Sequence, residues 1–213
     1  SGMHMHFSMF AGQDNAFYSD DDPYNLSPTA KQFMAGLLRH AAEITAITNQ
    51  TVNSYKRLVP GFEAPVHISW ARNNRSGLIR VPIPKRGNPS ATRIEYRSPD
   101  PACNPYLAFS VILAAGLKGI SEGYELASEA AANLFELDDA ALAALSIETL
   151  PQSLSDSLKV MEQSTLVREA LDAGKHVLME KPPTPTISEF DELGAHAKKK
   201  RRGLFQTWHS QYN

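Results

Sequence analysis

Short segments that alternate between apolar and polar residues lie among longer apolar segments of helical period, and this order predicts a mixed fold of helices and sheet. The alternating segments are residues 66–70, 77–82 and 92–97, and the helical ones are 27–49, 100–123, 138–146 and 153–171. Ser27 and Pro28 form a helix start signal, with serine as the N-cap and proline as the first helical residue. We expect the second long helix to be capped at Asp100, to end by Gly123 and to be well buried.

The alternating segments are rich in arginine. The arginines between residues 72 and 97 are Arg72, Arg75, Arg80, Arg93 and Arg97. Glu95 would share a strand face with Arg93 and Arg97, because side chains repeat every two residues. Such a face suits a polyanion such as a nucleoside triphosphate, and a carboxylate among arginines suits a divalent metal that bridges phosphates. A structural network of salt bridges is the alternative.

The first residues of the chain alternate in the same way. His4, His6 and Ser8 would share one strand face, whereas Met5 and Phe7 would face a core. Two histidines on one face can bind a metal, or one can bind metal while the other donates to phosphate. A pair of histidines that face solvent is the alternative, and the apolar interleave argues against an expression tag.

Residues 53–65 place a cation and a carboxylate around a turn signal. Arg57 and Glu63 flank Pro60-Gly61, so we expect both charges in a loop rather than on one face of a helix. Arginine offers a planar fork for a carboxylate or phosphate, and glutamate can accept a proton. The loop could therefore hold an ionic substrate. An ordinary surface loop with an ion pair is the alternative.

Composition excludes several classes of protein. The net charge of −2 argues against a nucleic-acid-binding surface over the whole molecule. A single cysteine, Cys103, excludes an internal disulfide and is typical of a reducing compartment. No apolar run is long enough to span a membrane and no signal peptide is visible, so we expect a cytoplasmic protein. Because the chain begins with Ser1 and not Met, we also expect it to be the interior of a longer protein.

Residues 1 to about 168 resemble the C-terminal catalytic portion of the glutamine synthetase family. The matching segments are residues 1–6, 53–65, 72–76, 93–102 and 104–106, which are long and correctly spaced. The resemblance implies an α+β fold, an antiparallel sheet with packed helices, over residues 1–170. It also implies ring-shaped homo-oligomers whose active sites form between neighbouring subunits.

The resemblance implies roles for individual residues. His4 and Glu95 would be metal ligands, Arg57 and Arg97 would bind glutamate, and Glu63 and Arg75 would be catalytic. The implied ATP contacts are His6, Ser8, Arg75, Arg80 and Arg93. The implied reaction joins glutamate to ammonia or a small amine through γ-glutamyl phosphate, with ATP as phosphoryl donor and Mg²⁺ or Mn²⁺ as metal.

The end of the chain changes character. Residues 174–182 and 207–213 resemble the Gfo/Idh/MocA family of NAD(P)-dependent oxidoreductases. The pattern predicts a strand over 176–179, a helix over 188–200 and a strand over 204–208, which is a small β-α-β Rossmann-like fragment within 171–213. The glycine-rich dinucleotide loop of that family is absent, so we expect no cofactor binding there.

The two resemblances meet within residues 164–174. A chain that leaves one family within a domain and enters another within a domain favours a chimeric gene or a fusion, because domains carry their own cores. We therefore expect an incomplete and inactive ligase. The alternatives are an oxidoreductase fragment and a non-catalytic product.

Overall fold

The computed structural model describes residues 2–60, 64–72, 76–83, 88–130, 134–166, 169, 177–180 and 204–207. The strands are β1 (Met5–Phe7), β2 (Phe10–Ala11), β3 (Asp14–Asn15), β4 (His67–Ala71), β5 (Gly77–Arg80), β6 (Ile94–Tyr96), β7 (Val177–Glu180) and β8 (Leu204–Thr207). The α-helices are α1 (Pro28–Arg39), α2 (Ala41–Thr48), α3 (Ser54–Arg57), α4 (Pro105–Glu122), α5 (Asp139–Ala144) and α6 (Leu154–Gln163). Single 3-10 turns cover Pro89–Ala91 and Leu134–Glu136.

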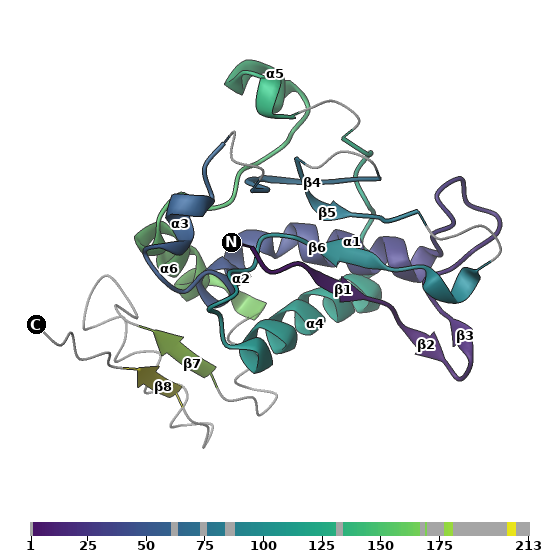
Figure 1. Cartoon of the computed structure of the whole chain (residues 1–213), viewed down its shortest axis with the longest axis horizontal. Helices are drawn as coiled ribbons and strands as arrows, with labels where there is room; N and C mark the ends of the chain where they lie inside the picture. The colour runs from purple at the N-terminus through teal and green to yellow at the C-terminus, as the bar shows by residue number, and fades with distance from the viewer. Residues whose placement is uncertain are drawn as a thin grey trace, which may run out of the picture.

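The main sheet has the strand order β1-β6-β5-β4 (Figure 1). β6 pairs antiparallel with both β1 and β5, but β4 and β5 pair in parallel. The sheet is therefore mixed, and the expectation of an antiparallel sheet was wrong for this edge. The connection between β4 and β5 is short, and a short connection predicts an antiparallel hairpin, since parallel strands usually need a long crossover. Alternation of side chains fixes the faces of a strand but not the direction of its partner.

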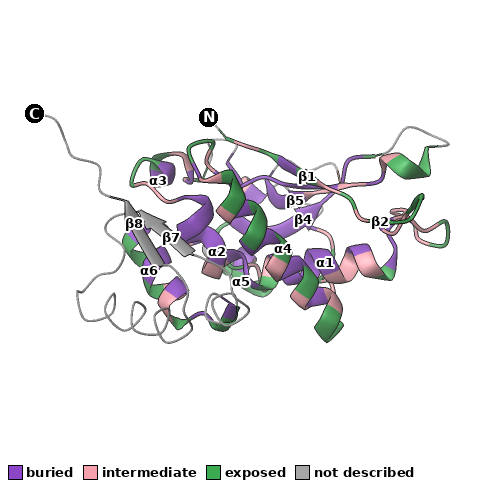
Figure 2. Ribbon diagram, turned by 90° about the horizontal axis from the view of Figure 1, so that it is seen from below, coloured by how far each residue is buried: buried purple, intermediate pink, exposed green. Residues whose placement is uncertain are grey.

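Helices α1, α2 and α4 form a layer against one face of this sheet (Figures 1 and 2). Phe33, Met34 and Leu37 of α1 are buried, as their helical spacing predicts, and they meet the buried Ile79 and Ile94 of the sheet in one core cluster. The sheet thus buries its apolar side chains against the helices and leaves its charged side chains on the opposite face.

The first long helical segment is two helices rather than one. Ser27 is the N-cap as predicted, because its Oγ accepts a hydrogen bond from the amide of Ala30 at 3.1 Å. The helix then breaks at His40, whose φ of −100° and ψ of 6° are not helical. Thr48 ends the second piece, so the predicted end near Asn49 is confirmed.

Helix α4 differs from prediction at its start and on its surface. Its N-cap is Asn104, whose side chain accepts from two amides of the first turn, whereas Asp100 caps only the preceding turn. Gly123 ends the helix with a φ of 65°, the left-handed conformation that favours glycine. The helix is not buried all round. Its exposed apolar stripe consists of Tyr106, Phe109, Leu113 and Leu117, which are 83%, 48%, 46% and 44% exposed.

The end of the chain contributes a separate two-stranded sheet. β7 and β8 pair in parallel, with Val177 opposite Leu204 and Glu180 opposite Thr207. The expected helix over 188–200 lies outside the described residues, so the β-α-β fragment stays a prediction. Within the described part of the chain, no helix combines the length and the apolar character needed to cross a bilayer.

Candidate active site

The pairing of β1 with β6 brings the first predicted site residues together. His6 lies opposite Glu95 in the register, and Met5 lies opposite Tyr96. Met5 and Tyr96 are buried, so the alternation turns the charged members of both strands toward the other face. His4 Nδ1 then lies 2.7 Å from Glu95 Oε1.

The carboxylate of Glu95 is the centre of the cluster. Its side chain is only 3% exposed, and its second oxygen accepts a hydrogen bond from Arg80 Nε. Arg97 Nε lies 3.8 Å from Oε1. Burial pushes the pKa of Glu95 upward, but the hydrogen bond and charge of Arg80, with the nearby histidines, hold it below its ordinary value. The lowered pKa favours the ionised carboxylate, and the guanidinium groups of Arg80 and Arg97 lie beside it.

His6 and Arg93 form a second pair beside this cluster. Arg93 Nε donates to His6 Nδ1 at 3.3 Å, and Arg93 Nη1 donates to the carbonyl of Ala91 at 3.1 Å. Ser8 follows β1 directly and is exposed. His6 and Ser8 are exposed and lie on or next to β1, the outermost strand of the sheet, and Arg93 is half-buried beside them.

Arg57 lies at the end of the short helix α3, so the expectation that it belongs to a loop was wrong. Its Nη1 donates to the carbonyl of Ser98 at 2.7 Å, and its Nη2 donates to the carbonyl of Arg97 at 3.0 Å. Burial lowers the pKa of the guanidinium, with a small opposing effect of Asp100. Gly2 packs on the same group, since an added Cβ would lie 2.1 Å from Nη2. Arg57 thus holds the backbone that follows β6.

Glu63 and Arg75 lie outside the described residues, so their predicted catalytic roles stay predictions. One residue that the sequence did not single out is Asn15. Its side-chain amide reaches the segment that leads into Arg93, with a hydrogen bond to the carbonyl of Thr92 at 2.8 Å. No motif marks such a contact, because a lone asparagine in a turn is common.

His4 and Glu95 fit a shared divalent cation. The two donor atoms are close enough for one ion to reach both, and a carboxylate with an imidazole suits Mn²⁺ and, less well, Mg²⁺. Burial and then the charge of Arg97 lower the pKa of His4, which favours the neutral imidazole that binds metals. Among the described residues, no three His, Cys, Asp or Glu side chains converge on one point.

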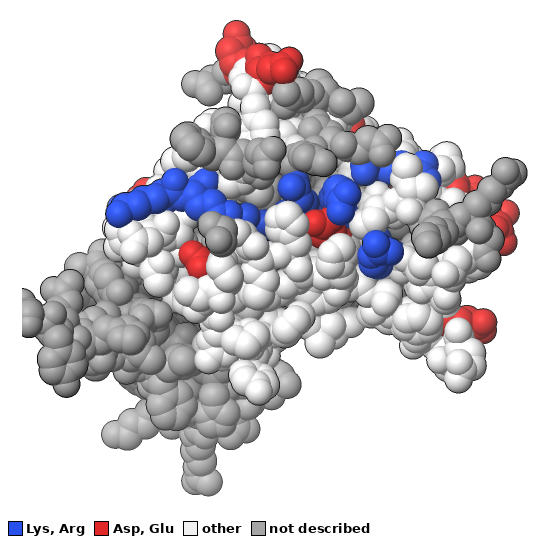
Figure 3. Space-filling view, viewed as in Figure 1, with Lys and Arg blue, Asp and Glu red and all other residues white. Residues whose placement is uncertain are grey.

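Positive charge dominates the surface around this cluster. Figure 3 shows Lys and Arg side chains in a band across the face of the molecule that carries the sheet, with a carboxylate between them. Such a band attracts anions and can stabilise charge that develops on a transferred phosphoryl group.

Comparisons with known proteins all match one family. A family model described as the catalytic domain of glutamine synthetase matches residues 1–180. The glutamine synthetase of Mycolicibacterium smegmatis is 54% identical over 177 residues, which are 83% of this chain and 39% of that protein. The glutamine synthetase of Thermotoga maritima is 49% identical over 177 residues, with the same shares.

A solved structure supports the same relationship at the level of the fold. The structure called "Apo GmaS without ligand" has a TM-score of 0.68 and 34% identity, and the match covers 94% of this chain and 40% of that one. The chain spans 39% of the length of the two curated relatives. The family match runs through residue 180, beyond the expected junction within 164–174.

Proposed function

Because the chain belongs to the glutamine synthetase catalytic-domain family, we propose that it carries part of the active site of an ATP-dependent ligase. The reaction joins glutamate to ammonia or a small amine through γ-glutamyl phosphate. The observation that carries this proposal is the convergence of His4, Arg80 and Arg97 on the buried carboxylate of Glu95. A site of this composition suits phosphoryl transfer, in which negative charge must be neutralised.

The proposed ATP contacts are His6, Ser8, Arg75, Arg80 and Arg93. Arg80 ends β5 and Arg93 directly precedes the neighbouring strand β6, so the two guanidinium groups could bind different phosphates of one nucleotide. A solved relative is called "GmaS/ADP complex-Conformation 1", which is consistent with a nucleotide site in this family.

Glutamate would bind between Arg57 and Arg97. Arg57 donates to the carbonyl of Arg97, so the two residues are already linked through the backbone. Arg97 is 6% exposed, and a buried guanidinium holds a carboxylate more strongly than an exposed one does. The rigid backbone after β6 would fix the distance between the glutamate and the nucleotide.

Glu95 and His4 would hold Mg²⁺ or Mn²⁺. When bound, the metal supplies positive charge that neutralises the phosphate oxygens and lowers their repulsion of an attacking carboxylate. Glu95 Oε1 would then exchange its present contact with His4 Nδ1 for the cation, while Oε2 keeps its hydrogen bond from Arg80.

The proposed reaction has two steps. The side-chain carboxylate of glutamate attacks the γ-phosphorus of ATP, the bond from that phosphorus to the bridging oxygen breaks, and ADP leaves. Ammonia or the amine then attacks the acyl carbon, and phosphate leaves with the electron pair of the broken bond. Arg75 would stabilise the transferred group, and Glu63 would take the proton from the ammonium.

The assay uses the 213-residue chain. We expect saturable binding of Mg·ATP by the chain, measured by fluorescence of a labelled ATP, and roughly tenfold weaker binding for Glu95→Gln. Glutamate- and ammonium-dependent release of phosphate measures turnover, and we expect none from the chain alone. Unchanged nucleotide binding by Glu95→Gln would contradict the proposed site.

We also propose ring-shaped homo-oligomers and a cytoplasmic location for this protein, supported by the family and by the single cysteine. The division into residues 1–170 and 171–213 is a further proposal. The parallel pairing of β7 with β8 is the observation that favours an NAD(P)-dependent oxidoreductase as the second candidate. A titration with NADPH, followed by its fluorescence, tests that candidate, and we expect no binding.

A further inference from the structure

The segment that leads into Arg93 begins with the 3-10 turn Pro89–Ala91, and Thr92 joins the two. Pro89 and Ser90 are exposed, so most of the turn does not pack into the core. The amide of Thr92 donates to the carbonyl of Pro89 at 3.1 Å, which closes the turn. A single turn of this kind has few hydrogen bonds of its own, so contacts from elsewhere decide how firmly it is held.

Asn15, the last residue of β3, provides such contacts. Its Nδ2 donates to the carbonyl of Thr92 at 2.8 Å, to that of Ser90 at 3.1 Å and to that of Pro89 at 3.3 Å. The primary amide has two N–H groups, so it can bond two of these carbonyls at once. One side chain thus holds the turn at its beginning and just after its end.

The oxygen of the Asn15 side chain is fixed to the core. It accepts a hydrogen bond from the amide of Phe17 at 3.0 Å. Phe17 is buried, and its ring centroid lies 5.4 Å from that of Phe33 in α1. The carbonyl of Phe17 accepts from the amide of Ser27, the N-cap of α1, at 2.9 Å. Asn15 therefore links the exposed turn to the buried start of α1.

Arg93 uses the same turn to orient its guanidinium. Its Nη1 donates to the carbonyl of Ala91 at 3.1 Å, and its Nε donates to His6 Nδ1 at 3.3 Å. In the chain, the carbonyl of Ala91 lies between two carbonyls that Asn15 bonds. A shift of the turn would move the Ala91 carbonyl and change the direction in which the guanidinium points.

We propose that Asn15 is a positioning residue of the nucleotide site, which fixes the turn so that the carbonyl of Ala91 directs the Arg93 guanidinium toward the phosphates of ATP. This inference rests on the proposed function, in which Arg93 binds ATP. A guanidinium has five N–H groups, so it can keep both of its contacts and still donate to phosphate oxygens. A guanidinium that is already oriented loses less conformational entropy when the nucleotide binds.

The test measures binding of labelled Mg·ATP by the 213-residue chain and combines two substitutions. Asn15→Ala should weaken binding roughly three- to tenfold, the range for lost hydrogen bonds that orient a neighbour. Arg93→Gln should weaken it more, by roughly ten- to a hundredfold, because a charged donor to phosphate is lost. In the Arg93→Gln background, Asn15→Ala should have no further effect, since Asn15 acts through Arg93. Equal weakening by Asn15→Ala in both backgrounds would overturn the proposal.

Unlabelled adenosine separates the positioning role from a general loss of structure. Adenosine lacks the phosphates, so as a competitor it should bind the wild type and Asn15→Ala equally well. A loss of adenosine affinity as large as the loss of ATP affinity would overturn the proposal. Gln13→Ala, at an exposed position of the same hairpin, is the matched control and should bind ATP as the wild type does.

Asn15→Gln is the milder change and replaces Asn15→Ala if that variant does not fold. It keeps the amide donors but moves them by one methylene, so we expect a smaller loss of ATP affinity that again disappears in the Arg93→Gln background. Absence of ATP binding by the wild type would overturn the proposed function and this inference with it. Binding by the wild type with unchanged affinity in the Asn15 variants would overturn this inference alone.

Discussion

Asn15 Nδ2 donates a hydrogen bond to the carbonyl oxygen of Thr92 at 2.8 Å, across 77 residues of sequence. The same amide donates to the carbonyl of Ser90 at 3.1 Å, and Asn15 Oδ1 accepts from the amide of Phe17 at 3.0 Å. One side chain thus ties the β2–β3 hairpin to the segment that leads into Arg93.

Replacing Asn15 with aspartate should destabilise the protein by about 2 kcal/mol, because a carboxylate cannot donate to the carbonyls and would repel them. Urea unfolding followed by circular dichroism measures the change. Gln13→Ala, at an exposed position of the same hairpin, should change stability by less than about 0.5 kcal/mol. Equal effects of the two substitutions would show that the contact contributes nothing.

Gly36→Ala should destabilise the packing of α1 on α4. An added Cβ would lie 2.2 Å from the backbone oxygen of Ala115 and 2.9 Å from Gly119 Cα, and backbone cannot move aside as a flexible side chain can. We expect a loss of about 2 kcal/mol in the free energy of unfolding, after the better helix propensity of alanine is included.

Gly12→Ala is the matched control for that substitution. Nothing lies within 4 Å of its added Cβ, but the φ of 67° strains any other residue. Its cost should be about 1 kcal/mol and should come from the backbone alone. If Gly36→Ala were as stable as the wild type, α1 and α4 could move apart to admit the methyl group without loss of stability.

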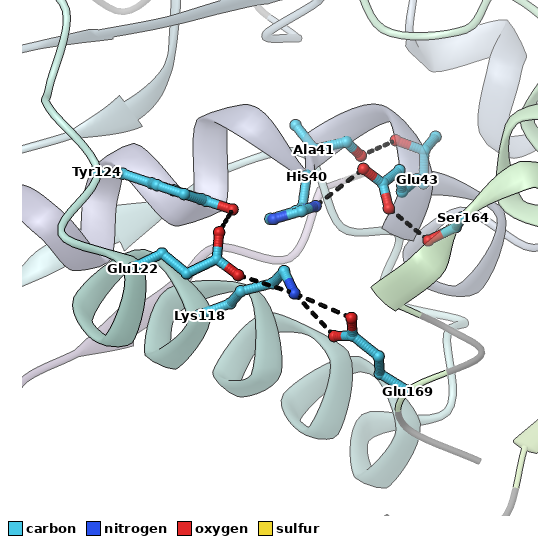
Figure 4. Close-up of polar contacts among 9 residues, drawn as sticks. His40, Ala41, Glu43, Lys118, Glu122, Tyr124, Ser164 and Glu169 are labelled. Carbon is cyan, nitrogen blue, oxygen red and sulfur yellow. Dashed lines mark hydrogen bonds and ion pairs between the residues drawn. The ribbon is translucent and has the colours of Figure 1, made fainter. Parts of the chain in front are cut away.

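Glu43, in the first turn of α2, bonds the N-cap of its own helix, His40, and the C-cap of α6, Ser164. Its Oε1 is 2.8 Å from His40 Nδ1, and its other oxygen accepts from the hydroxyl of Ser164 (Figure 4). Nearby, Lys118 of α4 pairs with Glu122 and Glu169. Burial raises the pKa of Glu43, but the bonds from His40 and Ser164 and the charges of His40 and Lys118 outweigh it and lower the pKa below 4.5.

A folded-state pKa below the unfolded value means that Glu43 stabilises the protein above about pH 4.5 and loses this contribution as the pH falls through the lowered value. Glu43→Gln should cost about 1–3 kcal/mol at pH 7 and flatten the loss of stability below pH 4.5. Urea unfolding between pH 7 and pH 3 measures both effects. Glu125→Gln, at an exposed position, should change stability at pH 7 by less than about 0.5 kcal/mol. If the stability of Glu43→Gln falls as steeply below pH 4.5 as that of the wild type, the assignment of this pH dependence to Glu43 is wrong.

Glu95→Gln should destabilise the fold as well as weaken nucleotide binding. Arg97 is 7% exposed at its side chain and would lose the carboxylate within 3.8 Å, which leaves a buried charge without that partner. We expect a loss of about 3 kcal/mol in the free energy of unfolding. Arg80→Gln removes a partner that is 38% exposed and should cost less, about 1 kcal/mol. A larger loss of stability in Arg80→Gln than in Glu95→Gln would show that the pair of Arg80 with Glu95, and not that of Arg97, stabilises the fold.

Local features of the chain followed from the sequence because they depend on residues close together. Ser27 caps α1 because a serine before a proline-led helix is in reach of its first free amides. Alternation sends the charged side chains of each strand, Glu95 among them, to one face, but the pairing of β1 and β5 with β6 decides that His4 and Arg80 meet Glu95. The family assignment rests on such ordered segments.

Only the tertiary structure decided which distant residues meet. The parallel pairing of β4 with β5, the exposed stripe on α4, the bonds from Arg57 to the backbone after β6 and the contact of Asn15 with Thr92 have no local signature. Periodicity specifies the direction of each side chain relative to its own backbone. The partner that it finds depends on how whole helices and strands pack, because burial of apolar surface is not directional.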